Sequence, residues 1–177
     1  MRILIAGLVG GLAMFIWAAI GHDLLPLGSV GMKTIPNEAP VLAAMQGSIG
    51  DKSGLYVFPA ASMQGKTAPG PGGFLVYSAK PTVMTPSVLG LEAASEIVQA
   101  LLLALVLSSL ALTGVWQRVG IAAAIGAAAA MCTSASYWIW YSFPTDYTLG
   151  YMFVDWVRFV VAGAVIALIL RTKPASA

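Results

Sequence analysis

The chain has 177 residues, of which 59% are hydrophobic and 9% charged, and its formal net charge is +2. An average soluble domain carries about 25% charged residues, so this composition excludes an ordinary water-soluble globule. The single cysteine, Cys132, excludes an intrachain disulfide and a cysteine-based metal site, and the lack of a basic cluster argues against nucleic acid as a partner.

The apolar residues gather in runs close to the ~20 residues needed to cross a ~30 Å hydrocarbon core. We expect transmembrane helices over residues 1–23, 87–113, 119–142 and 150–170. The first run has the outline of a signal peptide, but its length favours a retained helix. Short connections between the last three runs make consecutive helices antiparallel neighbours. The predicted fold is an all-α membrane protein, a four-transmembrane-helix antiparallel bundle forming one domain.

Residues 24–86 contain most of the prolines and no apolar run long enough to span a membrane, which predicts a loop region outside the bilayer. Within it, Asn37 and Glu38 begin a pattern typical of a short capped helix. Two short apolar runs, 55–58 and 74–77, are flanked by glycine or proline and predict strands that can pair as a hairpin.

Basic residues beside short connections set the predicted orientation in the membrane. Arg2, Arg118, Arg171 and Lys173 fall on one side under four spans, and Asp146 falls on the other. The positive-inside rule then places both termini in the cytoplasm and residues 24–86 in the periplasm. Aromatic residues gather toward the outer boundary, where amphipathic rings settle: Trp17, Tyr137, Trp138, Trp140, Tyr141, Tyr147 and Tyr151.

Small residues mark where helices can approach closely in lipid. Gly7 and Gly11 form a GxxxG spacing in the first helix. The third helix carries a longer series of small residues: Gly120, Ala123, Gly126, Ala127 and Ala130. This series predicts close packing, either against another helix of the chain or against another subunit.

Ionisable residues inside the spans are the most informative feature, because charge in a bilayer is costly unless it is paired or wet. Glu92, Glu96 and Gln99 share one face of the second helix, and Asp155 and Arg158 share one face of the fourth. Helix rise places both sets at similar depth, with the arginine roughly 12 Å below the outer surface. We therefore expect a buried ion pair between Glu96 and Arg158.

Two interpretations of this cluster stay open. In the first, the pair only links two helices, since breaking a buried pair would leave an unpaired charge. In the second, the surplus of three carboxylates over one arginine requires that at least one acid is protonated, binds a cation or contacts water.

His22 and Asp23, at the outer end of the first helix, could join Glu92 in a metal site for zinc, manganese or iron. The ordinary alternative is a hydrogen-bonded histidine at the membrane boundary. The sequence contains no nucleophile elbow, zincin motif or phosphate loop, and no cofactor is required. We expect Thr133, Ser134 and Ser136 to form hydrogen bonds between helices.

Three stretches of the loop region, Leu25-Pro26, Ile35-Pro36-Asn37-Glu38 and Gly54-Leu55-Tyr56-Val57-Phe58-Pro59, follow a glycine-rich first helix. In these features the chain resembles a family of small uncharacterised bacterial inner-membrane proteins. The resemblance implies a bacterial origin and an inner-membrane location, and it implies no activity or site residues.

The favoured function is therefore a non-enzymatic membrane component, either a homo-oligomer or a subunit of a larger membrane complex, with the lipid bilayer as its surroundings. An alternative is a carrier or receptor for a small ligand, cation or proton, in an outward-facing cavity lined by Glu92, Glu96, Gln99, Asp155 and Arg158. A membrane metalloenzyme is a third possibility. Limited room for alternating access favours the first class, and the carboxylate surplus favours the second.

Overall fold

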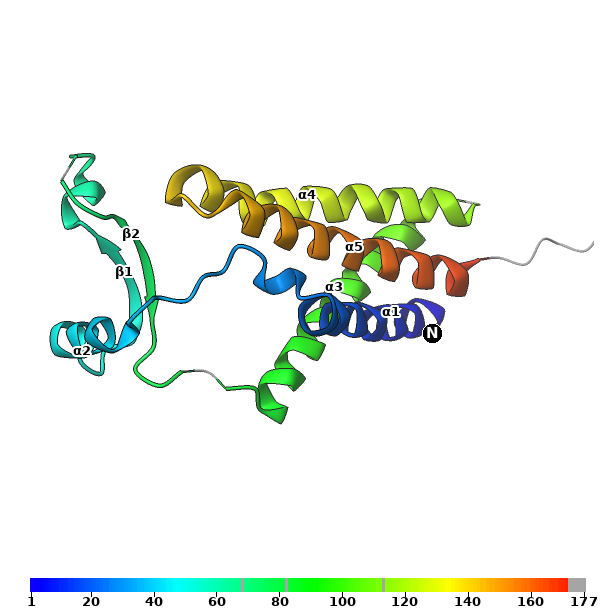
Figure 1. Ribbon diagram of the computed structural model, residues 1–177. Coiled ribbons are helices and arrows are strands. Elements are labelled where there is room, and N and C mark those ends of the chain that lie inside the picture. The colour runs from blue at the N-terminus through cyan, green and yellow to red at the C-terminus, as the bar shows by residue number, and fades with distance from the viewer. Residues whose placement is uncertain (68, 82, 113, 172–177) are drawn as a thin grey trace, which may run out of the picture.

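The computed structural model describes residues 1–67, 69–81, 83–112 and 114–171, so the expected role of Lys173 in orientation lies outside the described residues. Its long helices are α1 (Arg2–Ala19), α3 (Pro86–Ser109), α4 (Val115–Tyr141) and α5 (Thr145–Leu170). Four helices, with α1 extended to Leu24 by a π-helical turn, are long and apolar enough to cross a membrane. The four predicted helices are confirmed as helices with the length and composition needed to span a membrane (Figure 1).

Local hydrogen bonds explain where these helices begin. α3 starts at Pro86, because the Thr85 hydroxyl accepts the backbone N–H of Val88 at 3.3 Å. α4 starts before residue 119, because the Gln117 side chain accepts the backbone N–H of Gly114 at 3.1 Å. α5 likewise starts at Thr145 instead of residue 150, directly after Pro144. Proline suits this position because it lacks the N–H that an initial helical turn leaves without a partner.

Helix α1 lies between α3 and α5, and α5 lies between α1 and α4. The GxxxG spacing of α1 brings it against α3, since a Cβ on Gly11 would stand 2.5 Å from the Ile97 Cα and one on Gly7 would overlap Leu101. Small residues also join α4 to α5, where a Cβ on Gly126 would stand 2.5 Å from the Phe159 Cβ. Glycines permit these close backbone approaches, as expected for helix packing in lipid.

The expectation that consecutive helices are close neighbours is wrong for α3 and α4. α3 packs mainly on α1, α4 packs mainly on α5, and α3 runs at a steep angle to α4 and α5 (Figure 1). Small-residue contacts draw the two helices to different partners once they leave their short connection at residues 110–114. The arrangement is thus more open than an up-down bundle in which every neighbour in sequence is a neighbour in space.

The loop region contains helix α2 (Glu38–Ile49) and strands β1 (Gly54–Phe58) and β2 (Gly73–Tyr77). The strands pair antiparallel, with Leu55 opposite Val76, which confirms the predicted hairpin. α2 begins where predicted, but Asn37 does not cap it in the usual way. Its backbone is left-handed, with φ of 54°, and its side chain makes no capping hydrogen bond.

The hairpin lies across the loop end of the helices, and its strands run crosswise to α4 and α5 (Figure 1). The hydroxyl of Tyr77, on one face, lies 3.0 Å from Gln46 Oε1 and 2.9 Å from the Gly50 carbonyl, and its single proton is shared between these two acceptors, which fixes α2 to the hairpin. Successive strand residues point to opposite faces. Phe74 therefore belongs to the other face, where its ring centroid lies 4.1 Å from that of Tyr141 at the end of α4.

Candidate functional site

The predicted ion pair between Glu96 and Arg158 is present and buried. Arg158 Nη1 lies 2.6 Å from Glu96 Oε1, and the Glu96 side chain is 0% exposed. The pair joins α3 to α5 beside α1, so it links two helices that otherwise contact each other little. Because an arginine in hydrocarbon needs a carboxylate or water, this contact stabilises the bundle at a place where packing alone is sparse.

Asp155, on the same helix as Arg158, forms a second ion pair with it. Arg158 Nη2 lies 3.2 Å from Asp155 Oδ1, three residues earlier on α5. One guanidinium therefore bridges two carboxylates, one on each helix. The planar fork of arginine suits this arrangement, because its two terminal nitrogens point to different partners.

The other predicted members of the cluster lie at its edge. Glu92 is exposed, although it is near enough to Glu96 and Asp155 to interact with both electrostatically. Gln99 donates a hydrogen bond to the Ser95 hydroxyl at 3.2 Å, within its own helix, and forms no hydrogen bond with the ion pair among the described residues. The buried part of the cluster is thus Glu96 and Arg158, with Asp155 partly exposed at 19%.

Counted from the start of its helix, Arg158 lies further along than expected from the sequence. Because α5 begins at Thr145, Arg158 follows 13 residues later, about 20 Å along a helix of about 39 Å. Glu96 lies 10 residues after Pro86, about 15 Å along α3. The pair is therefore close to the middle of helices α3 and α5.

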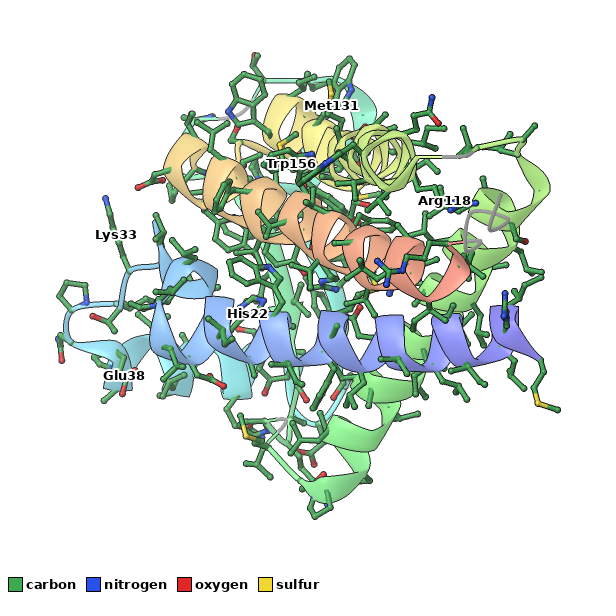
Figure 2. All side chains as sticks on the ribbon, turned by 90° about the vertical axis from the view of Figure 1, so that its right-hand side faces the viewer. His22, Lys33, Glu38, Arg118, Met131 and Trp156 are labelled. Atoms are coloured by element: carbon green, nitrogen blue, oxygen red, sulfur yellow. The ribbon has the colours of Figure 1, made fainter. Side chains whose placement is uncertain are left out.

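The structure turns His22 toward this cluster by a feature that the sequence did not predict. Residues Ile20–Leu24 form a π-helical turn, closed by a hydrogen bond of 2.9 Å from the Leu25 N–H to the Ile20 carbonyl. His22 then lies between α1 and α5 (Figure 2), with its ring 6.2 Å from that of Tyr151 in an edge-on arrangement. Gly28 packs directly on the imidazole, where any Cβ would overlap it.

The structure does not assemble the metal site considered from the sequence. Within the described residues, no three His, Cys, Asp or Glu side chains lie together in a way that could hold a metal ion. The π-helical turn points His22 inward while its neighbour Asp23 stays exposed, since adjacent helical residues face different directions. His22, Asp23 and Glu92 are thus separate features, and His22 instead belongs to the aromatic packing around Tyr151.

Aromatic rings extend from the hairpin to His22, most of them from the predicted outer belt. Successive ring centroids lie between 4.1 and 6.2 Å apart, in the order Phe74, Tyr141, Tyr137, Phe143, Tyr147, Tyr151 and His22. Trp17 adds a hydrogen bond of 3.0 Å from its Nε1 to the Val154 carbonyl, joining α1 to α5. These rings gather at the loop end of the spans, the position that amphipathic rings favour at a membrane boundary.

The polar residues of α4 do not form the expected interhelical hydrogen bonds. The Thr133 hydroxyl donates to the Ala129 carbonyl at 3.0 Å, within its own helix. Ser134 is buried and Ser136 is exposed, and neither side chain forms a hydrogen bond within the described part of the chain. The interhelical hydrogen bond to α4 comes instead from Trp156 of α5, whose Nε1 donates to the Ala123 carbonyl at 3.1 Å (Figure 2 shows Trp156 beside α4).

Small residues recur on two sides of α4. The inner small face consists of Ala122, Gly126 and Ala130, which are buried. The outer small face consists of Gly120, Ala124 and Ala128, which are exposed. A Cβ on Gly120 would meet no atom of the described residues within 4 Å.

Comparison with known proteins gives no relative for this chain: no family model, no curated protein and no solved structure matches it.

Proposed function

We propose that this chain is a non-enzymatic membrane component that assembles through the outer small face of α4, with a second copy of itself as the partner. The observation that carries this proposal is the repetition of one packing pattern on opposite sides of α4. Positions 120, 124 and 128 repeat the four-residue spacing of positions 122, 126 and 130, rotated by about 200°.

The inner small face demonstrates what this spacing does in the chain. Gly126 receives Phe159 of α5, and Ala122 lies directly against Gly163. Rows of small residues four apart let helix backbones approach and cross closely in lipid. An equivalent row on the opposite side, with Gly120 unoccupied by the described residues, offers the same geometry to another helix.

A second copy is the simplest partner for this face. Two copies inserted in the same direction can bring their α4 helices together about a two-fold axis along the membrane normal. Each outer small face then meets its own counterpart, which is the self-complementary arrangement of a symmetric dimer. No change in the ion pair is needed, since Glu96 and Arg158 lie on other helices.

The basic residues support an inner-membrane orientation for this component. Arg2, Arg118 and Arg171 all lie at the helix ends opposite the hairpin. The positive-inside rule places that end in the cytoplasm and the hairpin outside, in the periplasm of a bacterial cell.

Disulfide trapping in native membranes tests the interface. Cys132 is the only cysteine, so Cys132→Ala gives a cysteine-free chain in which Ala124→Cys adds one thiol on the outer small face. The matched control is Leu12→Cys in the same background, since Leu12 is 56% exposed on α1. Mild oxidation should trap a dimer of the Ala124→Cys chain and leave the Leu12→Cys chain monomeric.

Equal trapping of both chains would contradict the interface, because it would show only random collision. Trapping of Ala124→Cys with a different polypeptide would contradict the second copy as partner and keep the chain as a subunit of a mixed complex. Either outcome is read by mass after cleavage of the crosslinked band.

A second function is favoured by one specific observation. Glu96 Oε2 is buried and has no hydrogen-bond partner among the described residues, while Glu92 and Asp155 add further carboxylates nearby. This surplus suits a receptor or carrier for a proton. Thermal stability followed as the pH falls tests it: a change with pH that Glu96→Gln removes supports the carrier, and the same pH dependence in the wild type and Glu96→Gln contradicts proton binding at this carboxylate.

A further inference from the structure

The buried carboxyl group of Glu96 has an oxygen that its ion pair does not use. Oε1 faces Arg158, whereas Oε2 is buried and has no hydrogen-bond partner among the described residues. The Glu92 side chain, one helical turn earlier on α3, comes within hydrogen-bonding reach of Glu96. Two carboxylates are both acceptors, so this contact becomes a hydrogen bond only when one of them carries a proton. Glu92 and Glu96 can therefore hold one proton between them.

Glu92 connects this buried group to the loop end of the helices. It lies four residues closer than Glu96 to the start of α3 at Pro86, and it is exposed. A proton from solution can bind Glu92 and then pass to Glu96, which becomes a neutral carboxyl group while Glu92 returns to its carboxylate. Glu92 thus has the position of a relay between the solvent and a fully buried acid.

One face of α5 carries ionisable groups on the same side of the ion pair. Tyr147, Tyr151, Asp155 and Arg158 follow one another at spacings of three or four residues, which places them on one helix face. The His22 ring packs against that of Tyr151 at 6.2 Å. The ionisable groups around Glu96 are therefore Glu92 on α3, Asp155 and Arg158 on α5, and His22 and Tyr151 further toward the hairpin.

The opposite side of the ion pair is a closed apolar core. The α5 face that carries Arg158 continues with Ala162 and Ile166, which are both 0% exposed. Gly10 of α1 packs on Ile166 and Ala100, and α3 adds further fully or nearly fully buried side chains: Leu103, Ala104 and Leu107.

This core offers no ionisable side chain to a proton. Residues 159–170 of α5, 97–109 of α3 and 3–21 of α1 contain no Asp, Glu, His, Lys, Arg, Tyr or Cys. On α5 this stretch is 12 residues, or about 18 Å long. Proton exchange through it would need either ionisable groups or water, and its tightly packed side chains provide neither.

We propose that Glu96 exchanges its proton with the hairpin end only, with Glu92 as the relay, so that the cluster is a one-sided proton receptor and not a carrier. This inference rests on the proton binding at Glu96 proposed above as the second function. It goes further because it assigns the side of access and the relay residue. A carrier needs access from both ends, and the apolar core closes one of them.

A pH change on one side of a sealed membrane tests the proposal. The full chain is reconstituted into liposomes with the hairpin outward, as checked by proteolysis of residues 54–77. The infrared band of protonated carboxyl groups is followed after the outer or the inner pH is lowered, and Glu96→Gln identifies the part of the band due to Glu96. Glu96→Asp, which keeps a carboxyl group but shifts its band, makes the same assignment if Glu96→Gln fails to fold.

We expect the Glu96 band to grow when the outer pH falls and to stay constant when the inner pH falls. Glu92→Gln should slow the outer response about a hundredfold, at the low end of what a positioned acid–base group contributes to proton transfer. The matched control is Asp23→Asn, which removes another exposed acid at the same end of the helices and should leave the rate unchanged.

A response to the inner pH would overturn the one-sided receptor, because protons would then cross the apolar core. An unchanged rate in Glu92→Gln, or equal slowing in Asp23→Asn, would overturn the relay. A band that responds on neither side has a different meaning, since it would contradict proton binding at Glu96 itself and so the second proposed function.

Discussion

The helices α1, α3 and α5 differ from α4 and the hairpin in whether their charged residues are paired and their small residues are packed against another helix. In the first group, Arg158 is paired with Glu96 and Asp155, and α3 packs directly against Gly7 and Gly11. In the second, a Cβ on Gly120 would meet no atom of the described residues within 4 Å, and the outer small face is exposed. The comparison teaches that the charged cluster mainly completes the fold, whereas the surfaces left open for other molecules lie on α4.

The largest expected effect comes from breaking the ion pair in the first region. Arg158→Met leaves Glu96 buried beside carboxylates without a counter-charge, which costs about 3–5 kcal/mol of stability. Thermal unfolding in detergent, followed by the folded fraction on size exclusion, measures this loss. The double variant Arg158→Met/Glu96→Leu should recover most of it, because an apolar pair leaves no buried charge. No recovery in the double variant would mean that the pair itself is required.

Two glycine substitutions separate the regions directly. Gly11→Leu places a side chain against the Ile97 backbone, 2.5 Å from the would-be Cβ, and should cost about 1–3 kcal/mol. Gly120→Leu meets no atom of the described residues within 4 Å, so the monomer should still fold while the dimer is lost, with only the stability that dimerisation adds missing. An equal fall in melting temperature for both variants would contradict the distinction between Gly11, which packs against α3, and Gly120, which contacts no other described helix.

A smaller effect is expected for Asp155→Asn. Its carboxylate is 19% exposed and accepts from Arg158 at 3.2 Å, while Glu96 still balances the arginine. Loss of this second partner should cost about 1 kcal/mol, measured by the same unfolding assay. A loss as large as that of Arg158→Met would instead identify Asp155 as the principal partner of the arginine.

The smallest expected effect is at the start of α3. Thr85→Ala removes the hydroxyl that accepts from the Val88 N–H at 3.3 Å, at an exposed position. A cost of about 0.5 kcal/mol is expected, at the low end for an N-cap. Thr85→Ser retains the hydroxyl and serves as the control, and equal destabilisation of both variants would argue against the cap.

Much of the fold could be predicted because hydropathy and helix periodicity are local properties of the sequence. The spans, the hairpin strands and the pair of Glu96 with Arg158 follow from apolar runs, alternation and the cost of charge in lipid. Helix starts were less predictable. α5 extends back to Thr145 because polar residues continue a helix beyond the apolar run, and Arg158 is therefore further from the start of its helix than expected.

Other features depend on contacts that the sequence does not reveal. The π-helical turn that orients His22 arises where α1 meets α5, and Gly28 accommodates the imidazole through tertiary packing. The separation of α3 from α4 reflects competition among small-residue faces, since each helix had several possible partners. Two rows of glycine and alanine on α4 predict close helix contacts, but only the structure shows that α5 packs against the inner small face.

Native mass spectrometry of the wild-type chain, extracted directly from membranes into nanodiscs and released at low activation energy, tests assembly most directly. The account predicts a mass of two copies for the wild type and of one copy for Gly120→Leu, with both chains folded. A single-copy mass for the wild type would contradict assembly through the outer small face of α4.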